Sequence, residues 1–144
     1  DIPIGMKNPT SGDLAVMLNS IIAAQKGHRF IYRGMDVSTD GNELAHAILR
    51  GGVDKYGTTI PNYHYEDIWR LSEMYKEKKL KNPAVIVDAN HSNSNKKHHE
   101  QIRIVREVLH TRKYNAELRK LIKGVMVESY LVDGRQDIGS ERYL

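Results

Sequence analysis

The sequence predicts an α/β fold in which parallel strands alternate with helices. One observation is a set of short apolar runs that each end in a polar segment, at residues 2–6, 47–49, 84–87 and 124–127. A second observation is that apolar residues between these runs recur at positions i, i+3, i+4 and i+7, which is typical of amphipathic helices. Alternation of this kind indicates βα units around a largely parallel sheet.

The helical periodicity predicts four helices. The first begins after the capping segment at residues 10–13, and the second runs over about residues 65–79. The third runs over about residues 95–110, and Asn115 caps a short fourth helix. The apolar residues expected on their buried faces are Leu14, Met17, Leu18, Ile21 and Ile22 in the first, Ile68, Leu71 and Tyr75 in the second, Ile102, Val105 and Leu109 in the third, and Leu118, Leu121 and Ile122 in the fourth.

Residues 29–50 are expected to hold a β-excursion from this alternation. Residues 29–33 are typical of a short strand, and Asp40 and Gly41 form a turn signal before the next strand. Glycines and a proline within residues 51–63 then predict a long, ordered loop over the strand ends.

The length of the chain limits the possible architectures. It has 144 residues, which is enough for a single domain with its own core, taken as residues 1–144. A closed eight-stranded α/β barrel typically needs about 250 residues and rarely fewer than about 200. The chain therefore forms either a small open α/β sheet or part of a (β/α)₈ barrel.

The composition narrows the class of partner. The net charge of +4 is spread over helices in which the signs alternate, so solvated helix faces are favoured over a nucleic-acid-binding stripe. No apolar run approaches the roughly 20 residues of a membrane span. The absence of cysteine excludes disulfides and thiolate metal sites within this chain and fits a cytoplasmic location.

Each apolar run is followed by one side chain that can bind a ligand or take part in catalysis. These side chains are Lys7, Arg50, His91 and Glu128. Because the carboxyl ends of parallel strands form the ligand crevice of α/β folds, we expect two cations, an imidazole and a carboxylate around one site.

His91 and Glu128 are the candidate metal ligands. Neutral imidazole binds divalent metals well, and the polar residues within 88–94 can fix its tautomer. A carboxylate at the mouth of a buried strand is costly unless it is paired or bound to a cation, so Glu128 is interpreted as a metal ligand or general base. The plainer alternatives are a histidine at a helix entry and a surface glutamate. A catalytic metal needs about three protein ligands, so others must come from elsewhere.

Arg50 and Lys7 are the candidate anion-binding residues. Arg50 precedes two glycines, and a guanidinium beside an uncrowded main chain suits a phosphate or carboxylate. Lys7 supplies a second positive charge to the same anion. A salt-bridged arginine and a lysine with a buried stem are the alternatives.

Four motifs lie at these residues: GMKN at 5–8, ILRGG at 48–52, DANHSNS at 88–94 and GVMVES at 124–129. With these motifs in the family's order and at similar spacing, the chain resembles the type I 3-deoxy-D-arabino-heptulosonate 7-phosphate (DAHP) synthases. The resemblance covers essentially the whole chain.

The resemblance implies the C-terminal portion of a (β/α)₈ barrel in a cytoplasmic transferase of the shikimate pathway, which leads to the aromatic amino acids. The family condenses phosphoenolpyruvate with erythrose 4-phosphate in an aldol-type reaction and releases phosphate. By position, Lys7 and Arg50 would hold phosphoenolpyruvate, Lys7 and His91 would be catalytic, and His91 and Glu128 would bind the divalent metal, which is manganese, iron, cobalt or zinc. The resemblance also implies a homo-oligomer.

The chain departs from the family pattern in several places. The family's cysteine ligand, its downstream aspartate ligand and its loop for the aldose phosphate have no counterpart here, and Tyr130 stands where relatives often place histidine. We therefore expect a site that is incomplete in this chain alone. The alternative function is a catalytically inactive barrel fragment that mainly self-associates.

Overall fold

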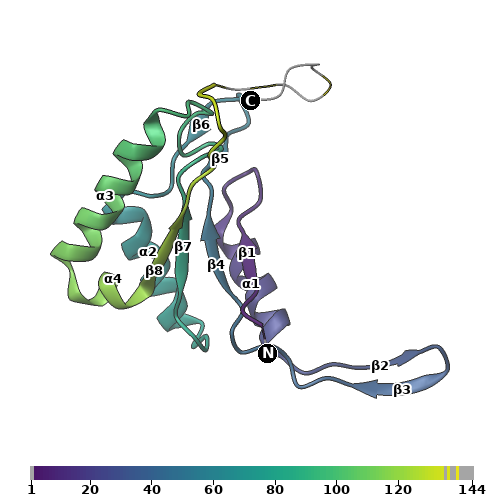
Figure 1. Ribbon diagram of the computed structural model, residues 1–144. Helices are drawn as coiled ribbons and strands as arrows, with labels where there is room; N and C mark the ends of the chain where they lie inside the picture. The colour runs from purple at the N-terminus through teal and green to yellow at the C-terminus, as the bar shows by residue number, and fades with distance from the viewer. Residues whose placement is uncertain (1, 135, 137–138, 140–144) are drawn as a thin grey trace.

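A parallel sheet in the order β1-β4-β7-β8 forms the centre of the molecule (Figure 1). This computed structural model describes residues 2–134, 136 and 139. The strands of the sheet are β1 (Gly5–Lys7), β4 (His46–Leu49), β7 (Val85–Asp88) and β8 (Ile122–Met126). Each neighbouring pair is parallel, and helices connect the strands, so the predicted α/β architecture is confirmed.

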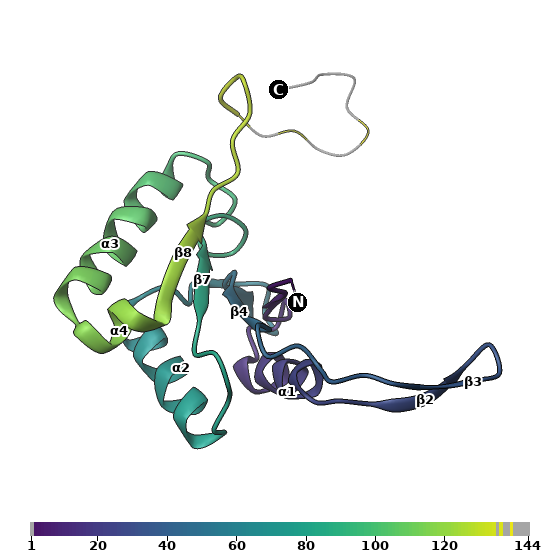
Figure 2. The same cartoon turned by 60° about the horizontal axis from the view of Figure 1, so that its bottom comes forward.

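The helices lie on one side of this sheet (Figure 2). They are α1 (Leu14–Gln25), α2 (Tyr65–Glu77), α3 (Glu100–Tyr114) and α4 (Ala116–Leu121). Asp13 caps α1 by accepting hydrogen bonds from the main-chain nitrogens of Ala15 and Val16. Asn115 caps α4 in the same way, as the sequence predicted.

The core lies between the helices and the sheet. Its buried residues on α1 are Met17, Leu18 and Ile21, and those on α2 include Ile68, Leu71 and Tyr75. They pack with β-strand residues such as Leu49, Val85 and Val87 and with Leu118, Leu121 and Ile122 beyond α3. The face predicted for the second helix is therefore confirmed, as are Leu118 and Leu121 in the fourth, whereas Ile122 belongs to β8 and not to α4.

The prediction for the third helix was wrong in its start and in its buried face. Asn95 and Lys96 have φ values of 51° and 57°, which a right-handed helix cannot accommodate, so α3 begins at Glu100. Ile102 and Leu109, which were expected on the buried face, are 63% and 51% exposed. The residues that α3 buries are Gln101, Ile104, Val108 and Thr111.

Two strand boundaries also differ from the prediction. The first strand was expected from residue 2, but β1 covers only Gly5–Lys7. The last was expected from residue 124, whereas β8 begins at Ile122 directly after α4. Ile122 is 1% exposed and pairs with Val85, so it belongs to the sheet because its side chain is buried and its main chain is paired there.

The predicted β-excursion is an antiparallel arm of β2 (Arg29–Tyr32) and β3 (Met35–Ser38). It projects away from the body of the molecule (Figures 1 and 2). The chain reverses at Arg33 and Gly34, whereas the turn signal at residues 40–42 lies at the base of the arm. The expected loop at 51–63 is ordered by a short antiparallel pair, β5 (Gly52–Val53) with β6 (Thr59–Ile60).

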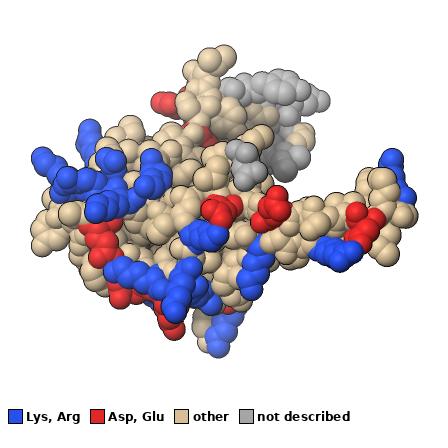
Figure 3. All heavy atoms as spheres, turned by 90° about the horizontal axis from the view of Figure 1, so that it is seen from below, with Lys and Arg blue, Asp and Glu red and all other residues tan. Residues whose placement is uncertain are grey.

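The surface carries charges of both signs. In the view of Figure 3, lysines and arginines lie in several groups with acidic residues between them. None of the helices in the described part of the chain has the length and apolarity needed to cross a bilayer.

Candidate functional site

The four residues predicted at the strand ends come together at one edge of the sheet. Lys7 is the last residue of β1, and Arg50 directly follows β4. His91 and Glu128 lie shortly after the ends of β7 and β8. Because the strands are parallel, their carboxyl ends share one edge, as expected.

His91 is the centre of this group. Its Nδ1 lies 3.1 Å from Arg50 Nη2, while its Nε2 lies 3.2 Å from Glu128 Oε1 and 3.4 Å from Asp88 Oδ2. A guanidinium only donates hydrogen bonds, so Nδ1 accepts and Nε2 carries the proton that faces the carboxylates. His91 thus joins the cationic side of the site to its anionic side.

Asp88 links Lys7 to the same group. The Asp88 carboxylate is fully buried, and its Oδ2 accepts a hydrogen bond of 2.8 Å from Lys7 Nζ. Its Oδ1 accepts one of 3.0 Å from the main-chain nitrogen of Asn90. A buried carboxylate is costly without such partners, so the ammonium of Lys7 and the carboxylate of Asp88 hold each other in place.

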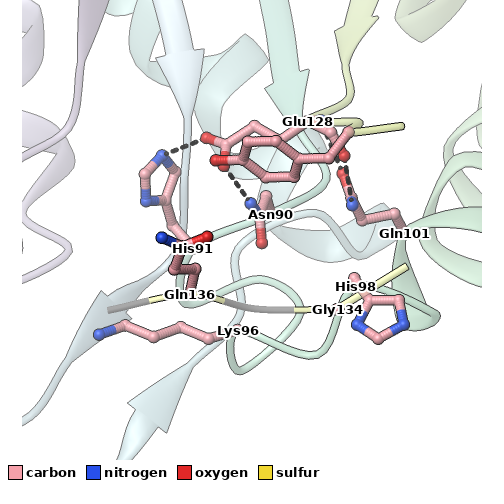
Figure 4. Close-up of a pocket in the computed structure, with 9 residues that line it drawn as sticks. Asn90, His91, Lys96, His98, Gln101, Glu128, Gly134 and Gln136 are labelled. Atoms are coloured by element: carbon pink, nitrogen blue, oxygen red, sulfur yellow. Dashed lines mark hydrogen bonds and ion pairs between the residues drawn. The ribbon is translucent and has the colours of Figure 1, made fainter. Parts of the chain in front are cut away.

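Glu128 is held on its main chain and on its side chain. Gln101 of α3 donates to the Glu128 carbonyl oxygen and accepts from the Glu128 N–H, each at 2.9 Å. Asn90 Nδ2 donates to Glu128 Oε2 at 2.5 Å. These contacts direct the carboxylate toward His91 (Figure 4).

The local backbone explains how His91 reaches this position. Its φ is 50°, in the left-handed region that few non-glycine residues adopt, although histidine is enriched among them. The His91 carbonyl oxygen accepts a hydrogen bond of 2.9 Å from the Lys96 N–H, which closes the turn. The turn directs the ring back over the end of β7. His91 therefore does not lie at the entry of a helix, which was the plainer alternative from the sequence, because α3 begins only at Glu100.

A cavity of about 190 Å³ opens beside His91 and Glu128. Figure 4 shows His91 and Asn90 directed at the Glu128 carboxylate, with Gln101 at the Glu128 main chain. Lys7 and Arg50 do not line this cavity. Arg50 contacts His91 directly, whereas Lys7 is linked to His91 through Asp88. The residues around it are Asn90, His91, Lys96, His98, Gln101, Glu128, Tyr130, Gly134 and Gln136.

One side of the site has donors that fit a metal ion. Ligand atoms of Asp88, His91 and Glu128 all lie within 4.8 Å of one another. Two carboxylates and an imidazole are a donor set that divalent transition metals accept. Sequence reasoning identified His91 and Glu128 but counted Asp88 only as a polar neighbour. The signal for Asp88 was its place as the last residue of an otherwise apolar strand.

Fold and site together define an α/β protein that gathers cations, an imidazole and carboxylates at the carboxyl ends of parallel strands. The sequence model of the DAHP synthetase I family matches residues 1–144. The chain belongs to this family.

Individual relatives agree with this assignment. The chain is 41% identical over 140 residues to the phospho-2-dehydro-3-deoxyheptonate aldolase of Haemophilus influenzae, a match that covers 94% of this chain and 36% of that protein. It is 36% identical over 142 residues to the enzyme of the same name from Corynebacterium glutamicum, covering 95% of this chain and 36% of that protein. The chain thus spans just over a third of the length of these curated relatives.

A solved structure shows the same arrangement of elements. The phospho-2-dehydro-3-deoxyheptonate aldolase from Francisella tularensis superposes with a TM-score of 0.80 at 32% sequence identity. The superposition covers 99% of this chain and 40% of that one. This agrees with the predicted fold class, an α/β portion of a larger barrel.

Proposed function

We propose that this chain supplies phosphoenolpyruvate-binding and metal-binding residues of a DAHP synthase, which joins phosphoenolpyruvate to erythrose 4-phosphate and releases phosphate. The observation that carries the proposal is the contact of His91 with Arg50 on one ring nitrogen and with Glu128 on the other. This places an anion-binding guanidinium beside a pair of metal-binding side chains. The names of the relatives support the same activity.

In this proposal Arg50 and Lys7 hold the phosphate or carboxylate of phosphoenolpyruvate. One ammonium proton of Lys7 binds Asp88, which leaves two donors for the substrate. Arg50 and Lys7 would orient the substrate so that its C3 faces the aldehyde carbon of erythrose 4-phosphate, where the new carbon–carbon bond forms. Lys7 and His91 are the proposed catalytic residues, because both would contact the reacting groups.

Glu128 and His91 Nε2 would hold a divalent manganese, iron, cobalt or zinc ion. Because Nε2 would then need its lone pair, the ring proton would move to Nδ1, and Arg50 would turn from Nδ1 to the anion. When bound, such an ion supplies a Lewis acid that polarises the aldehyde or positions a water molecule. Asn90 and Gln101 keep the Glu128 carboxylate in place, and Asp88 lies within reach of the same ion. A cytoplasmic location stays a prediction.

A calorimetric titration of phosphoenolpyruvate into this chain, with and without Mn²⁺, tests the proposal. We expect binding that depends on Mn²⁺ and is strongly weakened, though still measurable, in Arg50→Ala and His91→Ala. Arg106→Ala, which removes an arginine of α3, is the matched control. Absence of binding in both conditions, or an affinity that Arg50→Ala and His91→Ala leave unchanged, would reject the site in this chain.

We also infer that the chain self-associates through its arm, which would form the homo-oligomer expected from the sequence. Phe30, Ile31 and Tyr32 of the arm are 46%, 78% and 53% exposed, and Met35 is 59% exposed. A two-stranded ribbon is marginally stable by itself in water, so a second copy that covers these side chains would stabilise it. In a catalytically inactive fragment this contact would be the main visible behaviour.

Light scattering after size-exclusion chromatography tests the self-association. Ile31→Lys places a charge on the arm and should shift the chain to a monomer. Ile102→Lys is the matched control, since Ile102 is 63% exposed on α3. A mass that Ile31→Lys leaves unchanged would exclude the arm as the contact surface.

A further inference from the structure

Three buried asparagine side chains surround the main chain where Arg50 leaves the sheet. Asn8, Asn62 and Asn93 are 1%, 8% and 5% exposed. Asn8 follows β1, Asn62 precedes α2 and Asn93 follows β7, so each belongs to a different connection. Amide side chains are rarely buried without a structural reason, because each brings donors and acceptors that need partners.

Their partners are the main-chain groups on both sides of Arg50. Asn8 Oδ1 accepts from the Arg50 N–H at 2.9 Å, and Asn8 Nδ2 donates to the Gly51 carbonyl oxygen at 2.8 Å. Asn62 Oδ1 accepts from the Gly51 N–H at 2.8 Å. Asn93 Nδ2 donates to the Leu49 carbonyl oxygen at 3.3 Å. The peptide groups that set the direction of the Arg50 side chain are therefore fixed by side chains from outside β4.

The three asparagines also bind one another. Asn62 Nδ2 donates to Asn8 Oδ1 at 3.1 Å, and the Asn62 main-chain N–H donates to Asn93 Oδ1 at 2.9 Å. Asn93 Nδ2 makes a further bond of 2.8 Å to the carbonyl oxygen of Asp88, at the end of β7. Because the bonds form one network, removal of one amide leaves buried groups on the others without partners.

Gly51 shows how closely the chain is packed here. Its φ is +72°, and a Cβ atom at this position would lie 2.7 Å from the main-chain nitrogen of Asn93. The strand end of Arg50 therefore contacts the turn that carries His91. With its main chain held in this way, Arg50 places its Nη2 3.1 Å from His91 Nδ1.

We propose that Asn8, Asn62 and Asn93 are positioning residues that aim the Arg50 guanidinium into the anion site. They act through the main chain of Arg50 and not by contact with the anion. The inference rests on the proposed function only in naming phosphoenolpyruvate as that anion. The geometric part, in which the asparagines set the contact between Arg50 and His91, stands without a ligand.

The first test is a double-mutant cycle between Asn62 and Arg50. In calorimetric titrations of phosphoenolpyruvate with Mn²⁺, Asn62→Ala should weaken binding about five- to tenfold, the effect of losing one hydrogen bond to a buried main-chain group. In an Arg50→Ala background the same substitution should cause no further loss. Equal losses in both backgrounds, or no loss in either, would overturn the proposal.

The second test needs no ligand and separates the positioning role from the proposed function. The NMR signals of the His91 ring report its contact with Arg50. In Asn62→Ala these signals should shift toward those of Arg50→Ala, and the amide of Gly51 should exchange its hydrogen faster. His91 signals that stay at their wild-type positions would overturn the proposal, whether or not the chain binds phosphoenolpyruvate.

Asn115→Ala is the matched control for both tests. Asn115 Oδ1 accepts hydrogen bonds of 2.9 and 3.1 Å from the main-chain nitrogens of Glu117 and Leu118. Its loss removes main-chain partners just as Asn62→Ala does, but at the start of α4. A similar loss of stability with unchanged affinity and unchanged His91 signals is the expected result. Weakened binding in this variant would mean that destabilisation alone explains the effect of Asn62→Ala.

Discussion

The strand-end site and the β2–β3 arm hold their side chains in opposite ways. At the site, polar groups are fixed by buried partners, such as the fully buried Asp88 beneath Lys7 and Gln101, 5% exposed, beside Glu128. On the arm, Ile31 is 78% exposed, and the ion pair between Arg29 and Asp36 lies in solvent. The geometry of the site is therefore a property of the core, whereas the arm is free to vary without loss of the fold.

The largest expected effect follows from removing the cation beside Asp88. Lys7→Met leaves that carboxylate buried with only His91 and the Asn90 N–H as partners, and loss of one partner of a buried ion pair costs about 3 kcal/mol or more. Lys81→Met breaks the exposed pair with Glu43 and should cost less than about 1 kcal/mol. Urea unfolding measures both free energies. Equal small losses would show that Asp88 is not held as the structure indicates.

The site and the arm also differ in the space around two glycines that have similar backbone angles. Gly51 at the site and Gly34 at the tip of the arm have φ of +72° and +77°, but only Gly34 has open space around its missing Cβ. Gly34→Ala should therefore cost about 1 kcal/mol of stability, for the strained backbone alone. Gly51→Ala adds a main-chain overlap and should cost about 3 kcal/mol. Thermal unfolding of the two variants decides the matter, and equal shifts in Tm would contradict the packing at Gly51.

The body of the molecule should also lose stability at high pH through Tyr75. Burial raises the pKa of this hydroxyl to about 12 from 10.0, with Ala47 N–H and the Ala84 carbonyl oxygen as its partners. Between these values the unfolded chain releases the proton and the folded chain keeps it. The contribution of Tyr75 is therefore complete below pH 10 and is lost as the pH rises toward 12, by about 2 kcal/mol.

Tyr75→Phe checks this origin of the pH dependence. The variant lacks the ionisable hydroxyl, so its unfolding free energy should decline less steeply above pH 10. It should also be less stable at neutral pH, because the Ala47 N–H loses the hydroxyl as a partner. An unchanged alkaline slope would assign the loss to other groups.

The smallest effect is expected on the arm. Ile31→Ser should change the unfolding free energy of the monomer by no more than about 0.5 kcal/mol, since the side chain is already in solvent. Ile48→Ser in β4, where the side chain is 7% exposed, should cost several times as much. Urea unfolding at a concentration where the chain is monomeric gives both values. A large loss for Ile31→Ser would show that the arm packs on the body.

Much of the fold follows from patterns that a single sequence displays. The apolar runs predict the strands of the sheet, and Lys7, Arg50, His91 and Glu128, which follow these runs, lie at one edge as expected. This worked because a parallel sheet fixes which ends of its strands meet. The start of α3 was missed because the residues after His91 have cap-like composition but adopt left-handed turns.

Other features depend on contacts between distant segments, and these leave no local pattern. Asn8 and Asn62 lie 54 positions apart and meet only in the folded chain. Asp88 and Lys7 are 81 positions apart. Alone, Asn8, Asn62 and Asp88 are typical of a cap, a turn or a solvated surface, so the contacts that they make at the site are visible only in three dimensions.

The two hydrogen bonds between Gln101 and Glu128 have a mechanical consequence. Both main-chain polar groups of Glu128 are clasped by one side chain of α3, 27 positions earlier in the chain. These two bonds couple the segment that follows β8 rigidly to the first turn of α3. A tilt or slide of that helix would therefore move the Glu128 carboxylate as well. A contact on the outer surface of α3 would in this way change the geometry of the site.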